Sequence, residues 1–215
     1  MLMTSITVTE LKCACLDPEW RRRWLRGKRP STRSVALPGE PVAYGSLFHR
    51  IADEFVCWLL ESKKKAISLK DAAGLWGELY ERFAASELER IAQKGHLDSA
   101  LHLSEALKAF SARVAELRAR TPSFKNWQDV YLANEFLLKD VAFQQGGSAL
   151  RVSGKLDAVR FHPEDAVEVV DYKLTHGNHF KHDLVQLAIY TKLLELGAAG
   201  VEIQRDAGIL RADAA

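Results

Sequence analysis

The sequence lacks long apolar runs and the other marks of a protein that enters or crosses a membrane. No window holds the ~18 uninterrupted apolar residues of a membrane span, so we expect no membrane segment. The first residues lack a basic segment followed by an apolar one, so we expect no secretory signal. Internal repeats and low-complexity linkers are also missing. These absences predict a globular chain in the cytoplasm.

Cysteine is scarce, and charge of one sign is not in excess. Cys13, Cys15 and Cys57 are an odd number without a Cys-x-x-Cys pair, which argues against a disulfide framework and a zinc knuckle. Thirty Lys and Arg residues stand against 28 Asp and Glu residues, so the net charge of +2 identifies no partner. The P-loop pattern Gly-x-x-x-x-Gly-Lys-(Ser/Thr) is absent, so the sequence shows no ATP-driven motor of its own.

What is present is an average globular composition, with 47 % apolar and 27 % charged residues. The length of 215 residues predicts one domain, mainly helical over 1–125 and sheet-bearing over 126–215. A capping box at Thr7-Val-Thr-Glu10 predicts one helix start, and Asp17-Pro18 predicts a second helix that ends before Gly27. Longer amphipathic runs predict helices over residues 46–65, 68–95 and 103–117.

The second predicted helix carries a basic run. From Arg21 to Arg33 there are seven cationic side chains and no anionic one. The candidate nucleic-acid contacts in this helix are Arg21, Arg22, Arg23 and Arg26. Arginine interleaved with Trp20 and Trp24 suits the phosphates and bases of a single strand. A solvated helix face is an equally simple interpretation.

After residue 125 the apolar residues alternate, which is typical of half-buried strands. The predicted strands cover 130–143, 150–158, 167–173 and 201–210, with a helix from about 180 to 196 that stops at Gly197. Helices followed by a hairpin-rich sheet and a further helix predict a mixed α/β fold, a sheet flanked by helices.

Two aspartates are predicted to face one another on this sheet. The turn between the second and third strands centres near residue 164, which places Asp157 opposite Asp171 with Cβ atoms ~5 Å apart. Facing carboxylates repel, and a divalent cation such as Mg²⁺, Mn²⁺ or Ca²⁺ is the usual compensation. Lys173 lies on the same strand face as Asp171. The alternative is a solvent-exposed strand whose two aspartates pair with Lys155 and Lys173.

The next predicted helix carries one polar stripe at helical spacing, formed by His179, His182, Gln186 and Tyr190. Such a stripe on a helix that covers the sheet indicates the wall of a site, with His179 and His182 as candidate DNA contacts. A transition-metal cluster that includes His176 is a weaker alternative, because Gly177 and Asn178 interrupt the helix.

Together these residues resemble the PD-(D/E)xK nuclease superfamily and, within it, the RecB-type exonuclease clade. The clade's pattern is a His in an early helix, Gly-x-x-Asp, an (Asp/Glu)-x-Lys strand and Gln-x-x-x-Tyr on the following helix. The matching residues are His49, Gly154-Lys-Leu-Asp157, Asp171-Tyr-Lys173 and Gln186-Leu-Ala-Ile-Tyr190, with Glu135 where the clade often carries a Glu. The resemblance covers about residues 45–210.

The resemblance implies a restriction-endonuclease-like fold and metal-dependent cleavage of DNA phosphodiester bonds. By the same resemblance, one or two Mg²⁺ or Mn²⁺ ions would be bound by His49, Asp157, Asp171 and the carbonyl of Tyr172. Lys173 would position or deprotonate the attacking water and neutralise developing charge. Gln186 and Tyr190 would hold the DNA backbone and brace the lysine. For Glu135 a surface strand position is an alternative, and for His49 a helix-terminal position near Asp53.

RecB-type domains commonly lie beside motors, so the resemblance implies a helicase or ATPase partner or a larger fusion. DNA with a free or single-stranded end is the expected substrate, in repair, recombination, phage biology or antiviral defence.

Some clade members bind an iron–sulfur cluster through one N-terminal and three C-terminal cysteines. Cys15 resembles the first, but no cysteine follows Cys57, so no cluster is expected from this chain. The main alternative function is a catalytically silent DNA-binding or scaffold subunit, and a third is an unrelated hydrolase or binding protein.

Overall fold

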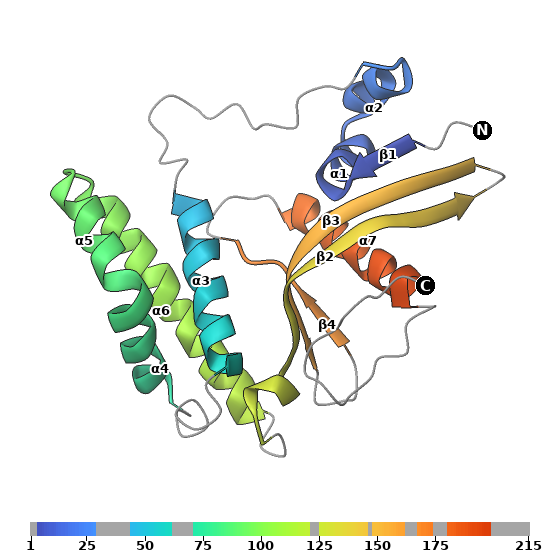
Figure 1. Cartoon of the computed structure of the whole chain (residues 1–215). Coiled ribbons are helices and arrows are strands. Elements are labelled where there is room, and N and C mark those ends of the chain that lie inside the picture. Colours follow the sequence, from blue (N-terminus) through green and yellow to red (C-terminus); the bar gives the residue numbers. More distant parts are fainter. Residues whose placement is uncertain are drawn as a thin grey trace.

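The computed structural model describes residues 4–28, 44–61, 71–120, 125–145, 148–161, 167–173 and 180–198. The N-terminal elements are β1 (Thr4–Thr7), α1 (Val8–Leu16) and α2 (Pro18–Leu25). A helical group follows, made of α3 (Tyr44–Glu61), α4 (Ala72–Leu79), a π-helical turn (Tyr80–Ala84), α5 (Ala85–Gln93) and α6 (Leu97–Arg120). A 3₁₀ turn (Trp127–Asp129) leads into β2 (Tyr131–Gln145), β3 (Ser148–Phe161), β4 (Val167–Val170) and α7 (Phe180–Ala198). The mixed α/β class predicted from the sequence is confirmed (Figure 1).

The centre of the sheet is β3. Along one edge it pairs with β2, antiparallel, from Ser148 to Arg160. Its other edge is shared, because β1 pairs in parallel with residues 150–153 and β4 pairs antiparallel with residues 158–161. Residues 154–157 of β3 therefore lie between the ends of β1 and β4. The site described below forms at this interruption.

Two apolar cores hold these elements in place. The first joins the helical group to the start of the sheet, and its buried members include Phe48, Phe55, Leu107, Trp127 and Tyr131. The second lies between the sheet and the helices α1 and α7, with Val8, Leu138, Val152, Tyr190 and Leu193. In Figure 1 the helical group stands beside the sheet while α7 runs across it. None of the helices within the described residues is long and apolar enough to cross a membrane.

Local sequence patterns correctly predict where α1 begins and where α2 begins and ends. The predicted capping box is present, since Thr7 Oγ1 accepts from the Glu10 amide at 3.2 Å and Glu10 Oε2 accepts from the Thr7 amide at 2.9 Å. Asp17 caps α2 by accepting from the amides of Glu19 and Trp20. Gly27, just beyond this helix, has a φ of +76°, a backbone conformation that favours glycine.

Other elements differ from the prediction. The helix predicted over 68–95 is interrupted by the π-helical turn, and the strand predicted over 167–173 is hydrogen-bonded as a strand only to Val170. The strand β1 is not predicted, because four residues are too few to show a periodicity. The strand predicted over 201–210 lies outside the described residues.

Candidate active site

The register of β3 and β4 brings the predicted aspartates level with each other. Ala158 pairs with Val170 and Val159 with Val169, so the next step along both strands leads to Asp157 and Asp171. The amide of Tyr172 donates to Asp157 Oδ2 at 2.6 Å and continues the contact beyond the last strand pair. The register predicted from the position of the turn is therefore confirmed.

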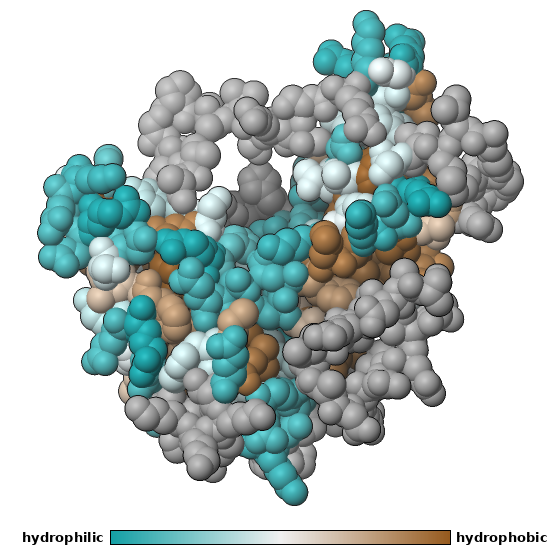
Figure 2. Space-filling model, viewed as in Figure 1, coloured by the Kyte–Doolittle hydropathy of each residue, from teal (hydrophilic) through white to brown (hydrophobic). Residues whose placement is uncertain are grey.

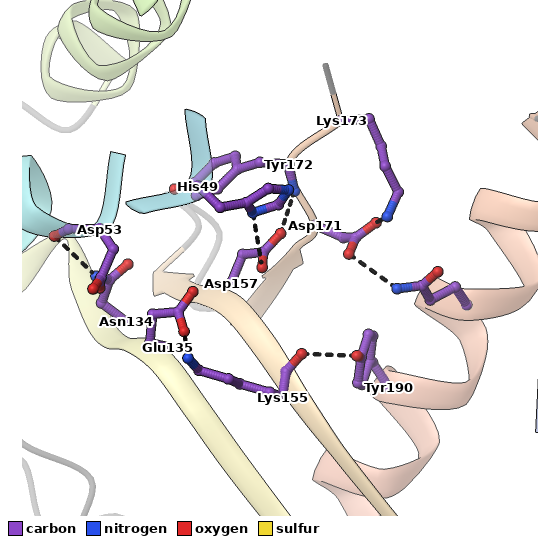
Figure 3. A network of polar contacts seen from close by, with 11 residues as sticks. His49, Asp53, Asn134, Glu135, Lys155, Asp157, Asp171, Tyr172, Lys173 and Tyr190 are labelled. Atoms are coloured by element: carbon purple, nitrogen blue, oxygen red, sulfur yellow. Dashed lines mark hydrogen bonds and ion pairs between the residues drawn. The ribbon is translucent and has the colours of Figure 1, made fainter. Parts of the chain in front are cut away.

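Glu135 extends this row onto a third strand. Asn134 pairs with Ala158 and Phe136 with Leu156, so Glu135 lies level with Asp157 on β2. Its φ of +52° falls in the left-handed region, which is costly for a residue with a Cβ and interrupts the regular pairing. The Glu135 carboxylate pairs with the ammonium of Lys155, as Figure 3 shows. Acidic side chains thus cross the sheet from β2 through β3 to the end of β4.

The helix α3 places His49 above this row. His49 Nδ1 lies 3.4 Å from Asp157 Oδ1, and the imidazole packs against the ring of Tyr172 (Figure 3). Phe48, on the buried side of the same helix, also contacts the Tyr172 ring, edge to face. The apolar contacts of α3 therefore fix the histidine beside Asp157.

A second link holds α3 to β2 close to Glu135. The side-chain amide of Asn134 donates to Asp53 Oδ1 and lies 3.4 Å from the Asp53 carbonyl oxygen. Burial raises the pKa of Asp53 above its usual value. This polar link fixes the distance between the helix that carries His49 and the strand that carries Glu135.

Asp171 is the most enclosed carboxylate of the group, with a side chain only 8 % exposed. Burial raises the pKa of Asp171, while the ammonium of Lys173, 2.5 Å from Asp171 Oδ2, acts in the opposite direction. The other oxygen, Oδ1, accepts a hydrogen bond from Gln186 Nε2 at 3.1 Å. A buried carboxylate with a cation on one side and an amide donor on the other is held in a single orientation.

Gln186 is in turn held by the N-terminal helix. Lys12 Nζ, on α1, donates to Gln186 Oε1 at 2.7 Å. The sequence contains no local signal for Lys12, because nothing near it shows that α1 packs against a helix 174 residues further along. The pairing of β1 with β3 brings α1 there.

Tyr190 lies one helical turn beyond Gln186 and fixes the backbone of β3. Its buried hydroxyl donates to the carbonyl of Lys155 at 2.7 Å, in the interruption between β1 and β4. Burial, together with the charge of Asp171, raises the pKa of Tyr190 to about 12. In this structure the hydroxyl is directed to the main chain beside Asp157, and the contact of Tyr190 with the DNA backbone stays a prediction.

The glycine of Gly154-x-x-Asp157 has a clear packing reason. A Cβ at Gly154 would lie 2.5 Å from Val8 Cγ2 and 2.8 Å from Tyr190 Cε1. Only a residue without a side chain lets α1 and α7 approach β3 this closely. Gly154 therefore leaves the space in which the ring of Tyr190 packs, so that the Tyr190 hydroxyl can reach the carbonyl of Lys155.

The predicted basic contacts on α2 are not brought to this group by any contact among the described residues. Arg21, Arg22, Arg23 and Arg26 are exposed on a helix whose surface is hydrophilic in Figure 2. Arg22 and Arg23 both pair with Glu19. Trp20 is buried and stacks on Trp24, so its ring is not open to a base. His182 is exposed on α7, and His179 lies outside the described residues.

The predicted metal ligands are neighbours, and the carboxylates of Asp157 and Asp171 are engaged with protein partners. Across the described ranges, no group of three or more His, Cys, Asp or Glu is arranged to hold a metal ion. The donor chemistry nevertheless fits a hard divalent cation, because two largely buried carboxylates and an imidazole meet at the end of β4.

Comparison with known protein families identifies one match. The model of the PD-(D/E)XK nuclease superfamily matches residues 16–214, which include every element from α2 to α7. The mixed sheet flanked by helices agrees with the restriction-endonuclease-like fold. No curated protein matches the sequence.

Proposed function

The chain belongs to the PD-(D/E)XK nuclease superfamily, and on that premise we propose that it hydrolyses DNA phosphodiester bonds at the end of β4. Members of this superfamily are in general metal-dependent nucleases. The observation that carries the proposal is the convergence on Asp157, which contacts His49 and the amide of Tyr172 while Asp171 and Lys173 follow directly. These groups come from three segments of the chain, namely α3, β3 and residues 171–173, and their supports come from α1 and α7.

His49, Asp157, Asp171 and the carbonyl of Tyr172 would hold one or two Mg²⁺ or Mn²⁺ ions. A divalent cation bound there lowers the pKa of water and stabilises negative charge on the phosphate. Lys173 keeps an ammonium beside the carboxylates, where it orients the attacking water and stabilises charge that builds up on the phosphate. Glu135 lies level with Asp157 and adds a third carboxylate to the same face.

The surrounding residues act as positioning groups. Gln186 holds Asp171 through its amide, and Lys12 holds Gln186. Tyr190 holds the main chain of β3 two residues before Asp157. Each of these contacts reduces the freedom of a carboxylate before substrate binds, which is the structural basis of preorganisation.

We further propose a RecB-type exonuclease that acts on free or single-stranded DNA ends beside a helicase or ATPase. The support is the order of His49, Gly154-x-x-Asp157, Asp171-x-Lys173 and Gln186-x-x-x-Tyr190, together with the absence of a P-loop from the sequence. The exposed arginines of α2 are candidate DNA contacts away from the bond that is cut.

The test is cleavage of end-labelled single- and double-stranded DNA with Mg²⁺, Mn²⁺ or EDTA. The parent is compared with Asp157→Asn and Lys173→Ala, and with Lys139→Ala as a matched exposed lysine on β2. We expect metal-dependent cleavage that falls ~100-fold or more in the first two variants and stays unchanged in the third. Single nucleotides released from an end would support the exonuclease, and internal fragments an endonuclease.

If the folded parent binds DNA but cleaves it with none of these metals, the nuclease proposal fails. A DNA-binding scaffold subunit would then be the better interpretation. If Asp157→Asn still cleaves DNA as the parent does, the active site does not lie at the end of β4.

A further inference from the structure

A cleft of about 590 Å³ lies between α6 and β4 and reaches the proposed site. Asp171, Tyr172 and Lys173 line it on one side, while residues 106–120 of α6 supply the opposite wall. None of the residues on the α6 wall belongs to the motifs that predicted the site. The cleft therefore adjoins Asp171 and Lys173 of the proposed site.

The α6 wall combines small and apolar side chains. Ala106 and Ala109 leave space beside Leu117, which is partly exposed, while Phe110 and Val114 on the same helical face are almost wholly buried in the first core. On the other side, Val170 and Tyr172 contribute further apolar surface. Apolar and aromatic surfaces of this kind suit the flat faces of nucleic-acid bases, whatever their sequence.

Cations line the same cleft, and one of them is available to an anion. Arg113 pairs with Glu116, Arg160 with Glu168 and Lys173 with Asp171. Arg120, the exposed last residue of α6, makes no ion pair within the part of the chain that the structure describes. The cleft thus carries one more cation than anion among these lining residues. Apolar walls together with unpaired positive charge fit a strand of nucleic acid, which has bases on one side and phosphates on the other.

The size of the cleft limits what enters it. Its volume falls within the roughly 300–1,000 Å³ of small-molecule sites, enough for one or two nucleotides of a single strand. A base-paired duplex does not fit such a space. Resting on the proposed nuclease function, we propose that the α6–β4 cleft binds the nucleotides of a single DNA strand next to the bond that is cut.

Fluorescence anisotropy of labelled (dT)12 tests this proposal in EDTA, where binding is measured without cleavage. Ala109→Trp fills the cleft from an exposed position, and Arg120→Glu reverses the unpaired charge. We expect each to weaken (dT)12 binding ~5-fold or more, the factor given by the loss of one stacked base. Lys108→Glu is the matched control, because it makes the same change of two charge units as Arg120→Glu at an exposed position of α6 that does not line the cleft. The affinity of this variant for (dT)12 should stay within ~2-fold of the parent.

A (dT)12 strand that carries 4-thiothymidine gives an independent readout by photocrosslinking. We expect crosslinks to residues 106–120, and their loss in Ala109→Trp. Parental affinity in both cleft variants, or crosslinks confined to other segments, would overturn the proposal. Binding that depends on the cleft without cleavage under any metal supports the cleft and overturns the nuclease proposal, so the two fail separately. A folded parent that does not bind (dT)12 overturns the cleft proposal alone.

Discussion

At the scale of single residues, the contacts of Gln186 explain why a neutral amide lies among charged groups. An ammonium only donates hydrogen bonds and a carboxylate only accepts them. Lys12 therefore takes the amide oxygen and Asp171 takes the amide nitrogen, so the two partners together fix one orientation of the amide. Glutamate in place of Gln186 would set a negative charge against Asp171, and a shorter side chain would not span the two partners.

Lys12→Met tests whether this chain of contacts matters. It keeps the length of the side chain but removes the donor, so the amide of Gln186 is free to turn away from Asp171. We expect ~10-fold weaker Mn²⁺ binding by titration calorimetry, with a matching loss of cleavage, as for residues that orient metal ligands. Lys12→Arg keeps a donor and should retain most of the affinity.

The double variant Lys12→Met with Gln186→Met separates this role from a general loss of packing. If Lys12 acts through Gln186, its substitution has no further effect once Gln186 is replaced. Equal losses of Mn²⁺ affinity in both backgrounds would contradict the positioning role.

At the scale of elements, the site depends on how β3 shares one edge between two short strands. Because β1 ends at Thr7 and β4 ends at Val170, residues 154–157 of β3 have no strand partner on that side among the residues that the structure describes. Tyr190 from α7 supplies a hydrogen bond to Lys155 there, and Gly154 leaves the space for it. The packing of two helices against one glycine thus positions the strand that carries Asp157.

Gly154→Ala is expected to lower the free energy of unfolding by ~1–3 kcal/mol, the cost of overpacking a buried contact. The added methyl group must displace Val8 or the Tyr190 ring, both within 3 Å of its position. Gly77→Ala on α4 is the matched control, because open space surrounds that position and alanine favours a helix. Urea unfolding checks both variants. A Gly154→Ala protein as stable as the parent would show that the helices shift at no cost.

At the scale of the whole molecule, each of the two cores contains a buried phenol. Tyr131 is fully buried in the first core, Tyr172 packs against that core, and Tyr190 belongs to the second. Burial raises the pKa of Tyr131 and raises that of Tyr172 well above its usual value. Folded protein therefore keeps these phenols protonated at a pH at which an unfolded chain loses the protons.

Stability should consequently fall as the solution becomes alkaline. Tyr190 has an ordinary pKa of 10 when unfolded and a pKa of about 12 when folded, so the unfolded state releases its proton first. The free energy of unfolding then decreases as pH rises through this interval, whereas below it the titration of Tyr190 adds no pH dependence. We expect circular dichroism and phenolate absorbance to change together in an alkaline titration. Tyr190→Phe should make the decline shallower, and an unchanged slope would contradict the assignment.

The sequence predicts those parts of this molecule that depend on near neighbours. Only five residues separate β3 from β4 in the sequence, so the midpoint of this short connection is enough to predict the register that brings Asp157 level with Asp171. The caps at Thr7 and Asp17 are equally local. Contacts between segments that are distant in the sequence have no comparable local sequence pattern. The hydrogen bond from Lys12 to Gln186 and the burial of Trp20 both depend on where α1 and α2 pack.

The pairing of β1 with β3 also has a consequence during synthesis. Thr4 pairs with Leu150, so 146 residues separate the partners along the chain. At ribosomal speeds of roughly 5–20 residues per second, the first strand waits about 7 to 30 s for its partner to be made. During that time its backbone donors and acceptors are unpaired, and it is open to other chains or to a chaperone. Because Lys12 follows this strand directly, its contact with Gln186 is among the last to form, and a nascent chain emerges before its site is complete.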